Sequence, residues 1–352
     1  MRINALLLML LFLGGAASFI PSPLHADQDK PISFYGKQVS FLKLFGQKRW
    51  GDAAPGYVVA NKVNHAAGVC VDRSSEPNHI YVADTGNNRI LGFKSYDSPK
   101  ADLIFGQPDE HSSAANGDCN IGFYGPTGPD QLCLTAYPWG TNVAEQWMFL
   151  HFDVDSEGNL YVPDTYNNRV LMYRAPFSED KTGGKGDTIA DVVWGQDDFR
   201  SNGINRGMGR ERRDARSLFI RLGGFDHVSA RGVSVDPQGN VWVADTFNYR
   251  VLRFPKGSTT ADLVIGQPNF ATALAERDIN KAGLGRFGTP TLARINPQTG
   301  ELWVIDEHPF GFKGRILIFT PPFFNGMAAS RIFSIRQKLA GDFKDGYVPT
   351  HL

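Results

Sequence analysis

The sequence predicts an all-β fold in which similar four-stranded antiparallel sheets repeat around a common axis. One pattern recurs as GVCVDRSSEPNHIYVADTGNNRILGF at 68–93, HFDVDSEGNLYVPDTYNNRVLMY at 151–173 and GVSVDPQGNVWVADTFNYRVLRF at 232–254. Each copy is followed by a short apolar run ending in Gly-Gln: ADLIFGQ, ADVVWGQ and ADLVIGQ. The 38 glycines, 21 prolines and 12% aromatic residues suit a turn-rich β protein. One such sheet cannot bury both of its faces alone, whereas sheets packed radially can, so the predicted fold is a β-propeller.

The strands of each repeat are called a to d in chain order, and the links between them indicate hairpins. The a-to-b link reads DSEGN or DPQGN, where glycine can supply the positive φ of a tight turn. The b-to-c link reads DT-x-NN-R, in which Thr and Asn can bond neighbouring backbone and Asn tolerates the left-handed conformation. The repeats with their following runs cover about 61–107, 145–196, 226–267 and 287–337.

The number of blades is read from the weaker copies at the two ends. The fourth repeat, LARINPQTGELWVIDEHPFGFKGRILIF at 292–319, has Asp306 and Arg315 nine residues apart, which predicts a longer, aromatic b-to-c loop. FLKLFGQ at 41–47 precedes the first repeat and predicts an N-terminal strand that closes the ring or belongs to a further blade. Four blades are therefore evident, with five or six as the alternative.

Each of the three strong repeats places an aspartate five residues before an arginine across the b-to-c turn, so that the two side chains can bridge the base of the hairpin. The pairs are Asp84 and Arg89, Asp164 and Arg169, and Asp245 and Arg250. A catalytic site normally occurs once in a chain. A set of Asp, Asn and Arg that returns in every blade therefore indicates turn architecture.

These residues also give the chain a family resemblance. The units resemble NHL repeats, whose usual form is close to GVAVD..GN.YVADT.NNR, here followed by the Gly-Gln run. The resemblance covers about three quarters of the mature chain and implies a single propeller domain over 27–352.

The N-terminus predicts export. MRINALLLMLLFLGGAASFIPSPLHADQ has the basic start, the apolar core and the small residues of a signal peptide, placed at 1–26. No later stretch is apolar for long enough to span a membrane, so we expect a periplasmic or extracellular protein without an integral membrane segment. Lys+Arg and Asp+Glu both total 36, which gives no electrostatic attraction toward nucleic acid.

Three cysteines in an exported chain suggest one disulfide and one thiol. Cys119 and Cys133 lie in one Gly/Pro-rich insertion and are expected to pair with each other. Cys70, in the apolar run GVCVD, is expected to be a buried, unreactive thiol.

A ligand surface is expected where the insertions lie. In an up-and-down blade the b-to-c turns and the d-to-a connections share one rim, and the long insertions here are d-to-a connections. Aromatic and basic residues on this rim are candidate ligand contacts: Tyr166, Phe247, Tyr249, His308 and Phe310 from b-to-c turns, Trp139 and Trp147 from the first insertion, and Arg212 and Arg213 from the Arg-rich run at 200–221. The alternative is that the aromatic residues fix the loops and the arginines are solvated.

Three histidines, His65, His151 and His227, lie near the starts of innermost strands and could turn toward the axis as zinc ligands. Their distances from the aspartate ending strand a differ, which argues against convergence. The peptidyl-hydroxyglycine amidating lyases resemble this chain in their repeat fold and place a Pro-His pair before strand a, but the corresponding positions here hold no histidine. A Ser-His-Asp arrangement assembled in space stays open, although the chain has neither GxSxG nor a P-loop.

Two classes of function remain. The first is an exported, non-catalytic propeller, without a cofactor, that binds a protein, peptide or glycan on its elaborated rim. The alternative is a propeller lyase or hydrolase with zinc or calcium in its central channel.

Overall fold

The computed structural model of the chain describes residues 32–34, 37–39, 58–64, 66–117, 127–134, 149–220, 230–275, 285–307, 314–335 and 348–349. The chain separates into two compact units, Met1–Ala54 and Pro55–Leu352. The first unit contains an antiparallel hairpin of β1 (Ile32–Phe34) and β2 (Lys37–Val39). The predicted signal peptide and the predicted strand at 41–47 lie outside the described residues.

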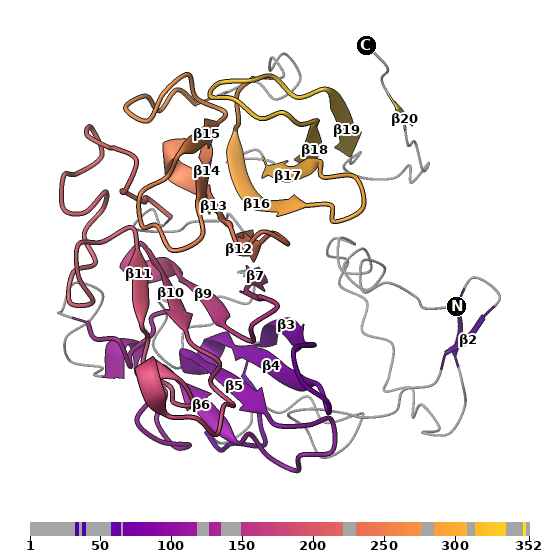
Figure 1. The fold of residues 1–352 in the computed structure, drawn as a ribbon, viewed down its shortest axis with the longest axis vertical. Coiled ribbons are helices and arrows are strands. Elements are labelled where there is room, and N and C mark those ends of the chain that lie inside the picture. Colours follow the sequence, from indigo (N-terminus) through magenta and orange to yellow (C-terminus); the bar gives the residue numbers. More distant parts are fainter. Residues whose placement is uncertain are drawn as a thin grey trace, which may run out of the picture. The chain divides into compact units, whose positions relative to one another are not determined.

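The second unit is built from antiparallel sheets whose strands follow one another in chain order (Figure 1). We call the four sheets blades 1 to 4. Blade 1 contains β3 (Ala66–Asp72), β4 (His79–Asp84), β5 (Arg89–Phe93) and β6 (Leu103–Phe105). Blade 2 contains β8 (Asp153–Val154), β9 (Leu160–Asp164), β10 (Arg169–Tyr173) and β11 (Val192–Trp194).

Blades 3 and 4 repeat this order. Blade 3 contains β12 (Ala230–Val235), β13 (Val241–Asp245), β14 (Arg250–Phe254) and β15 (Leu263–Ile265). Blade 4 contains β16 (Thr289–Ile295), β17 (Leu302–Glu307), β18 (Gly314–Phe319) and β19 (Arg331–Ile335), and β20 (Val348–Pro349) pairs with β19. These four-stranded antiparallel blades confirm the predicted all-β propeller fold.

The a-to-b hairpins form as their sequences predict. Gly158 and Gly239 have φ of 79° and 83°, a region that L side chains disfavour. The Asp155 carboxylate caps its turn by accepting the amides of Glu157 and Asn159 at 2.9 and 3.0 Å. The glycine and the aspartate therefore fix the hairpin together.

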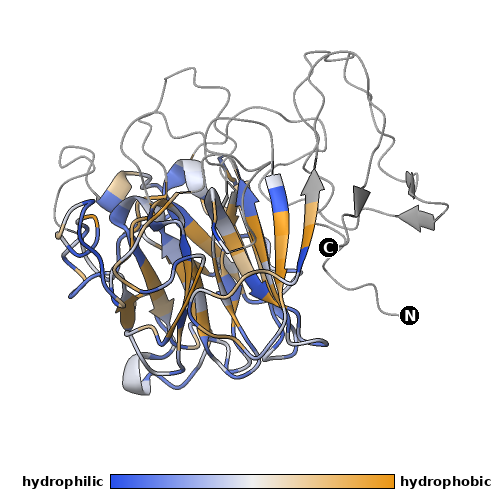
Figure 2. Cartoon of the chain, turned by 90° about the horizontal axis from the view of Figure 1, so that it is seen from above, coloured by the Kyte–Doolittle hydropathy of each residue, from blue (hydrophilic) through white to orange (hydrophobic). Residues whose placement is uncertain are grey.

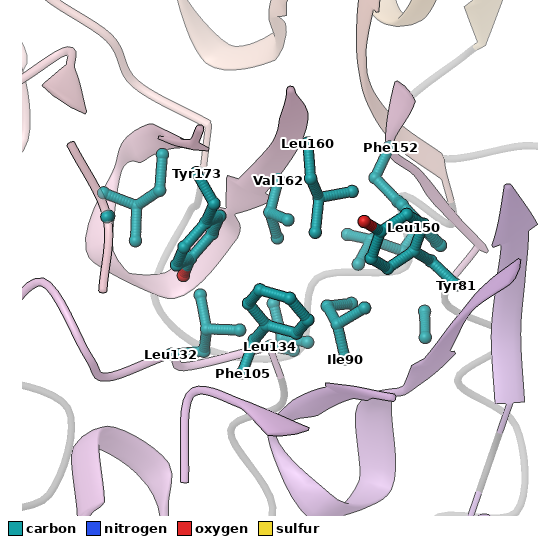
Figure 3. Packing of buried hydrophobic residues seen from close by; sticks show 13 residues of the cluster. Tyr81, Ile90, Phe105, Leu132, Leu134, Leu150, Phe152, Leu160, Val162 and Tyr173 are labelled. Atoms are coloured by element: carbon teal, nitrogen blue, oxygen red, sulfur yellow. The ribbon is translucent and has the colours of Figure 1, made fainter. Parts of the chain in front are cut away.

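Neighbouring blades share apolar cores because each strand turns alternate residues toward opposite faces. On β10, Leu171 belongs to the core between blades 1 and 2, whereas Val170 and Met172 belong to the core between blades 2 and 3. In the first core the rings of Phe105 and Tyr173 meet edge to face with centroids 5.0 Å apart (Figure 3). Figure 2 shows the apolar residues concentrated along the strands of the blades and hydrophilic residues toward the loops.

The innermost strand of blade 2 differs from the predicted single strand. Its first part, β7 (Phe149–His151), pairs in parallel with β12 of blade 3, and only β8 pairs with β9. Gly232 permits this approach, since a Cβ there would lie 2.7 Å from Leu292 Cδ1 and 3.1 Å from His151 Cβ. The inner strands of blades 2 and 3 are therefore paired with each other through β7 and β12.

Blade 4 carries the predicted longer b-to-c connection. Residues 308–313 join β17 to β18, whereas residues 85–88 are sufficient to join β4 to β5. Asp306 and Arg315, nine residues apart in sequence, are direct cross-strand partners. Insertion in the turn thus leaves the register of the pair unchanged.

Candidate functional site

The rim that carries the b-to-c turns has one backbone design in blades 1 to 3. Each turn is a short 3-10 segment followed by a left-handed residue that immediately precedes strand c. The segments are η3 (Thr85–Asn87), η6 (Thr165–Asn167) and η8 (Thr246–Asn248). The left-handed residues are Asn88, Asn168 and Tyr249, with φ of 52°, 49° and 54°.

A buried ion pair closes each turn. In blade 2, Arg169 Nε donates to Asp164 Oδ2 at 2.7 Å, and neither side chain is exposed. Asn167 Nδ2 and the Cys133 amide also donate to this carboxylate, at 2.8 and 2.7 Å. Equivalent pairs join Asp84 to Arg89, Asp245 to Arg250 and Asp306 to Arg315, at 2.7, 2.7 and 2.8 Å.

The arginine of each turn also binds the loops before and after its blade. Arg169 Nη1 donates to the carbonyl of Phe199 at 2.6 Å, and Nη2 donates to those of Gly128 and Gln131 at 3.0 and 2.9 Å. Arg89 makes the same kind of contacts, to the carbonyls of Glu110, Val59 and Lys62. Arg250 does so too, to the carbonyls of Phe270, Asp214 and Ser217. The donors of this planar cation are used inside the fold.

The glutamine of each Gly-Gln run completes the network. Gln196 Nε2 donates to the carbonyl of left-handed Asn168 at 3.0 Å and to that of Gly203 at 2.9 Å. Gln107 and Gln267 repeat both contacts, to Asn88 and Ala114 and to Tyr249 and Leu274. Asp, Asn, Arg and Gln, which could serve catalysis, are here held by one another and by backbone groups.

The predicted aromatic ligand contacts differ in exposure. Tyr166 and Phe247 are buried, with exposed fractions of 5% and 8%, and Phe247 packs on Phe219 with centroids 5.3 Å apart. Tyr249 is half-buried and lies immediately before β14. The two buried rings therefore pack within the blade turns.

The two predicted basic contacts lie in the described part of the second insertion. Arg212 is exposed. Arg213 is half-buried and donates to the carbonyls of Ala271, at 3.3 Å, and Arg210. Burial lowers the pKa of Arg213, and the neighbouring Arg250 lowers it further.

His151 lies on an innermost strand with both ring nitrogens engaged. Nδ1 lies 2.9 Å from the carbonyl oxygen of Val233, and Nε2 lies 3.0 Å from Nη1 of Arg294, whose Nη2 is 3.9 Å from Asp153 Oδ1. Burial lowers the pKa of His151, which favours the neutral ring that can accept from Arg294. Cys70 nearby is half-buried rather than fully buried as predicted. Burial still raises the pKa of its thiol to about 12, an effect that Asp153 strengthens, as expected for an unreactive thiol.

The other predicted site residues lie outside the described residues: His65, His227, His308, Phe310, Trp139, Trp147 and Cys119. The pairing of Cys119 with Cys133 therefore stays a prediction, and the alternative of a zinc site formed by the three histidines stays untested. Within the part of the chain that the structure describes, no three His, Cys, Asp or Glu side chains gather as metal ligands would.

The structure brings Asp72, His79 and Ser75 together at the a-to-b turn of blade 1. His79 Nδ1 lies 3.0 Å from Asp72 Oδ2, and Ser75 Oγ lies 3.3 and 3.2 Å from Nδ1 and Nε2. A hydroxyl in line with the Nε2 lone pair would be much farther from Nδ1, so Ser75 is not aligned for activation. Its hydroxyl donates instead to the carbonyl of Pro77 at 3.1 Å.

The other blades explain this His-Asp contact. Asn159 and Asn240 occupy the position of His79, and their Nδ2 atoms donate to Asp155 and Asp236 at 2.8 Å in both blades. His79 therefore replaces an asparagine that caps the turn. Its ring also packs on Phe177, with centroids 4.2 Å apart.

The repeated blades and turn networks define the class of protein, a β-propeller. Residues 229–254, which contain β12 to β14, match the family model of the NHL repeat. The chain thus carries an NHL repeat, as the resemblance of its sequence predicted. A search of curated protein sequences found no match, and no helix of the described residues has the length and hydropathy to cross a membrane.

Solved structures that resemble the chain do so weakly. Hydrazine synthase of Kuenenia stuttgartiensis matches with a TM-score of 0.37 and 8% identity, over 78% of this chain and 49% of that one. A putative 6-phosphogluconolactonase of Bacteroides uniformis matches with a TM-score of 0.37 and 12% identity, over 75% of this chain and 62% of that one. Virginiamycin B lyase of Staphylococcus aureus matches with a TM-score of 0.30 and 12% identity, over 78% of this chain and 82% of that one. The chain thus spans about half and three fifths of the first two structures.

Proposed function

We propose that the chain is a non-catalytic scaffold that binds a protein, peptide or glycan on the rim of its b-to-c turns. The observation that supports this proposal is the anchoring of the long insertions to that rim. The amide of Leu134 donates to Asn88 Oδ1 at 2.8 Å, and that of Ile220 donates to Asn168 Oδ1 at 3.1 Å. Each insertion is therefore held by the blade before it as well as by the blade after it.

Such anchoring suits a binding surface. Loops that vary on a rigid frame can contact a partner without loss of the fold. Residues 135–148 follow the anchored Leu134, and residues 221–229 follow the anchored Ile220. The side chains that could act chemically in the b-to-c turns are already bound to one another, which favours recognition over catalysis at this rim.

The experiment is cross-linking and capture with the exported form of the protein. We expect the wild-type chain to retain a specific partner, and replacement of residues 136–147 by a short Gly-Ser linker to abolish its capture. The control replaces residues 179–186, which join β10 to β11 on the opposite rim, and should capture the partner normally. Capture that survives the first replacement, or is lost only with the second, contradicts the proposal.

The metal-dependent lyase or hydrolase remains the competing hypothesis. It would require His151 to leave Arg294, because a metal ligand needs the nitrogen lone pair that faces Nη1. Metal analysis of the purified protein separates the two hypotheses. Stoichiometric zinc or calcium that is lost in His151→Ala would favour the enzyme.

A further inference from the structure

The Arg-rich run at 200–221 contains two kinds of arginine between residues 206 and 216. Arg206 is neutralised by Asp197 and Asp214, whose carboxylates lie 2.6 and 2.7 Å from its guanidinium. Arg216 lies 3.2 Å from the same Asp197. These carboxylates hold the backbone of the segment in place, including Arg206 itself, which has a positive φ of 59°.

Three further arginines, Arg210, Arg212 and Arg213, have no carboxylate partner among the described residues. Arg210 and Arg212 are exposed. The Arg210 guanidinium lies 5.8 Å from the centroid of the Phe219 ring, which holds the charge over the turn of blade 3. Glu211 lies between them in sequence and offsets one of the three charges.

Of the three, Arg213 is the one that is half-buried without a carboxylate in ion-pair contact, and it would gain most from a bound anion. Its Nη atoms donate to the neutral carbonyl oxygens of Ala271 and Arg210, and its Nε is buried without a partner. The nearby carboxylate of Asp245 forms its ion pair with Arg250, so it acts on Arg213 only as a more distant attraction. A cation that is partly removed from water beside another cation is stabilised when an anion binds.

We propose that Arg210, Arg212 and Arg213 form a subsite for an acidic peptide segment of the partner, an inference that rests on the proposed binding function of this rim. Guanidinium groups bind carboxylates through paired hydrogen bonds, and clusters of arginines recognise acidic motifs. The floor of the subsite favours a peptide over a glycan. Phe219, next to the Arg210 guanidinium, and Phe247, packed on Phe219, are both buried, so neither offers an open ring face on which a sugar could stack.

The test measures binding of a fluorescein-labelled hexaglutamate peptide by fluorescence anisotropy at low salt. Arg210→Gln/Arg212→Gln removes two exposed charges that form no ion pair among the described residues, together with the Arg210 contact to Phe219, and should weaken binding about tenfold. The matched control, Arg73→Gln/Lys94→Gln, removes two exposed charges near the opposite rim and should stay within about twofold of wild type. Binding by wild type should also weaken as salt is added.

The proposal is overturned if the first double variant binds like wild type, or if wild type does not bind the peptide. It is also overturned if a heparin hexasaccharide binds wild type more tightly than the peptide does and loses that advantage in the double variant. If capture of the partner is lost on replacing residues 136–147 but not in the Arg210 and Arg212 variant, the subsite proposal is wrong. The proposed binding function would then still hold. If capture of the partner is unchanged when residues 136–147 are replaced, the proposed function is contradicted, whatever the result with the peptide.

Discussion

A buried aspartate in each turn joins three separate segments of the chain. Asp164 accepts from Cys133 in the preceding insertion, from Asn167 in the turn and from Arg169 in the next strand. Burial raises the pKa of the Asp164 carboxyl, whereas the Arg169 guanidinium lowers it again. The three donors stabilise the ionised form, and this carboxylate in turn neutralises the buried Arg169.

Asp164→Ala should lower the free energy of unfolding by about 3 to 5 kcal/mol, because it leaves Arg169 buried without its counter-charge. Urea unfolding followed by tryptophan fluorescence measures the effect. Asp180→Ala is the control, since Asp180 is an exposed aspartate paired with Lys185 at the surface. Equal urea midpoints for the two variants would show that the Asp164 pair does not hold the turn.

His151 makes stability depend on pH. Its pKa is lowered in the folded chain by burial, so the unfolded chain binds the proton more tightly. The free energy of unfolding should therefore fall as the pH decreases below about 6.5, the ordinary value for histidine. In His151→Gln this part of the decrease between pH 7 and pH 5 should disappear, as measured by urea unfolding at both pH values. An unchanged pH dependence in the variant would contradict the neutral, Arg294-bound ring.

At the scale of structural elements, the Gly-Gln run is a packing device as well as the end of strand d. Gly195 has a φ of 90°, and a Cβ there would lie 2.6 Å from Leu218 Cδ1 and 2.8 Å from the carbonyl oxygen of Asn168. Gly106 and Gly266 make the equivalent approaches to Leu132 and Phe287. The insertion before each following blade thus packs onto the glycine of the blade before it.

Gly195→Ala should destabilise the fold by more than the roughly 1 kcal/mol that a left-handed alanine costs. Gly257→Ala is the matched control, because Gly257 has a similar φ of 77° but nothing within 4 Å of the added Cβ. Thermal unfolding of the two variants compares them directly. A melting temperature for Gly195→Ala as high as that for Gly257→Ala would show that the close approach is relieved at little cost.

The sequence predicted these elements unevenly. Turn glycines, the Asp-Arg spacing and the Gly-Gln runs are local patterns, and they located the strands and hairpins of the blades. The parallel pairing of β7 with β12 was not predicted, because it depends on a backbone contact between two repeats that are far apart in sequence. Gly232 permits this contact, but a glycine at that position does not by itself indicate which strand will approach it. The role of Gln196 was missed because its partners are carbonyl oxygens, which any residue supplies.

At the scale of the whole molecule, the ends of the insertions belong to the frame of the propeller. The sequence placed the insertions on the correct rim but did not predict how their ends are anchored, because nothing in their composition marks Cys133 or Phe219 as a hydrogen-bond donor to a buried carboxylate. The structure shows these amides bound to Asp164 and Asp245 at 2.7 and 2.6 Å. A partner bound on the rim would therefore be held by loops that are fixed at their bases.

Native-state hydrogen exchange at the amides of Cys133 and Phe219 tests this frame most directly. Both residues lie in insertions, yet we expect their amides to exchange as slowly as that of Val243 in the central strand β13, through global unfolding alone. Exchange of either amide at the rate of an open loop, while Val243 stays protected, would show that the buried Asp-Arg pairs do not bind the insertions to the blades.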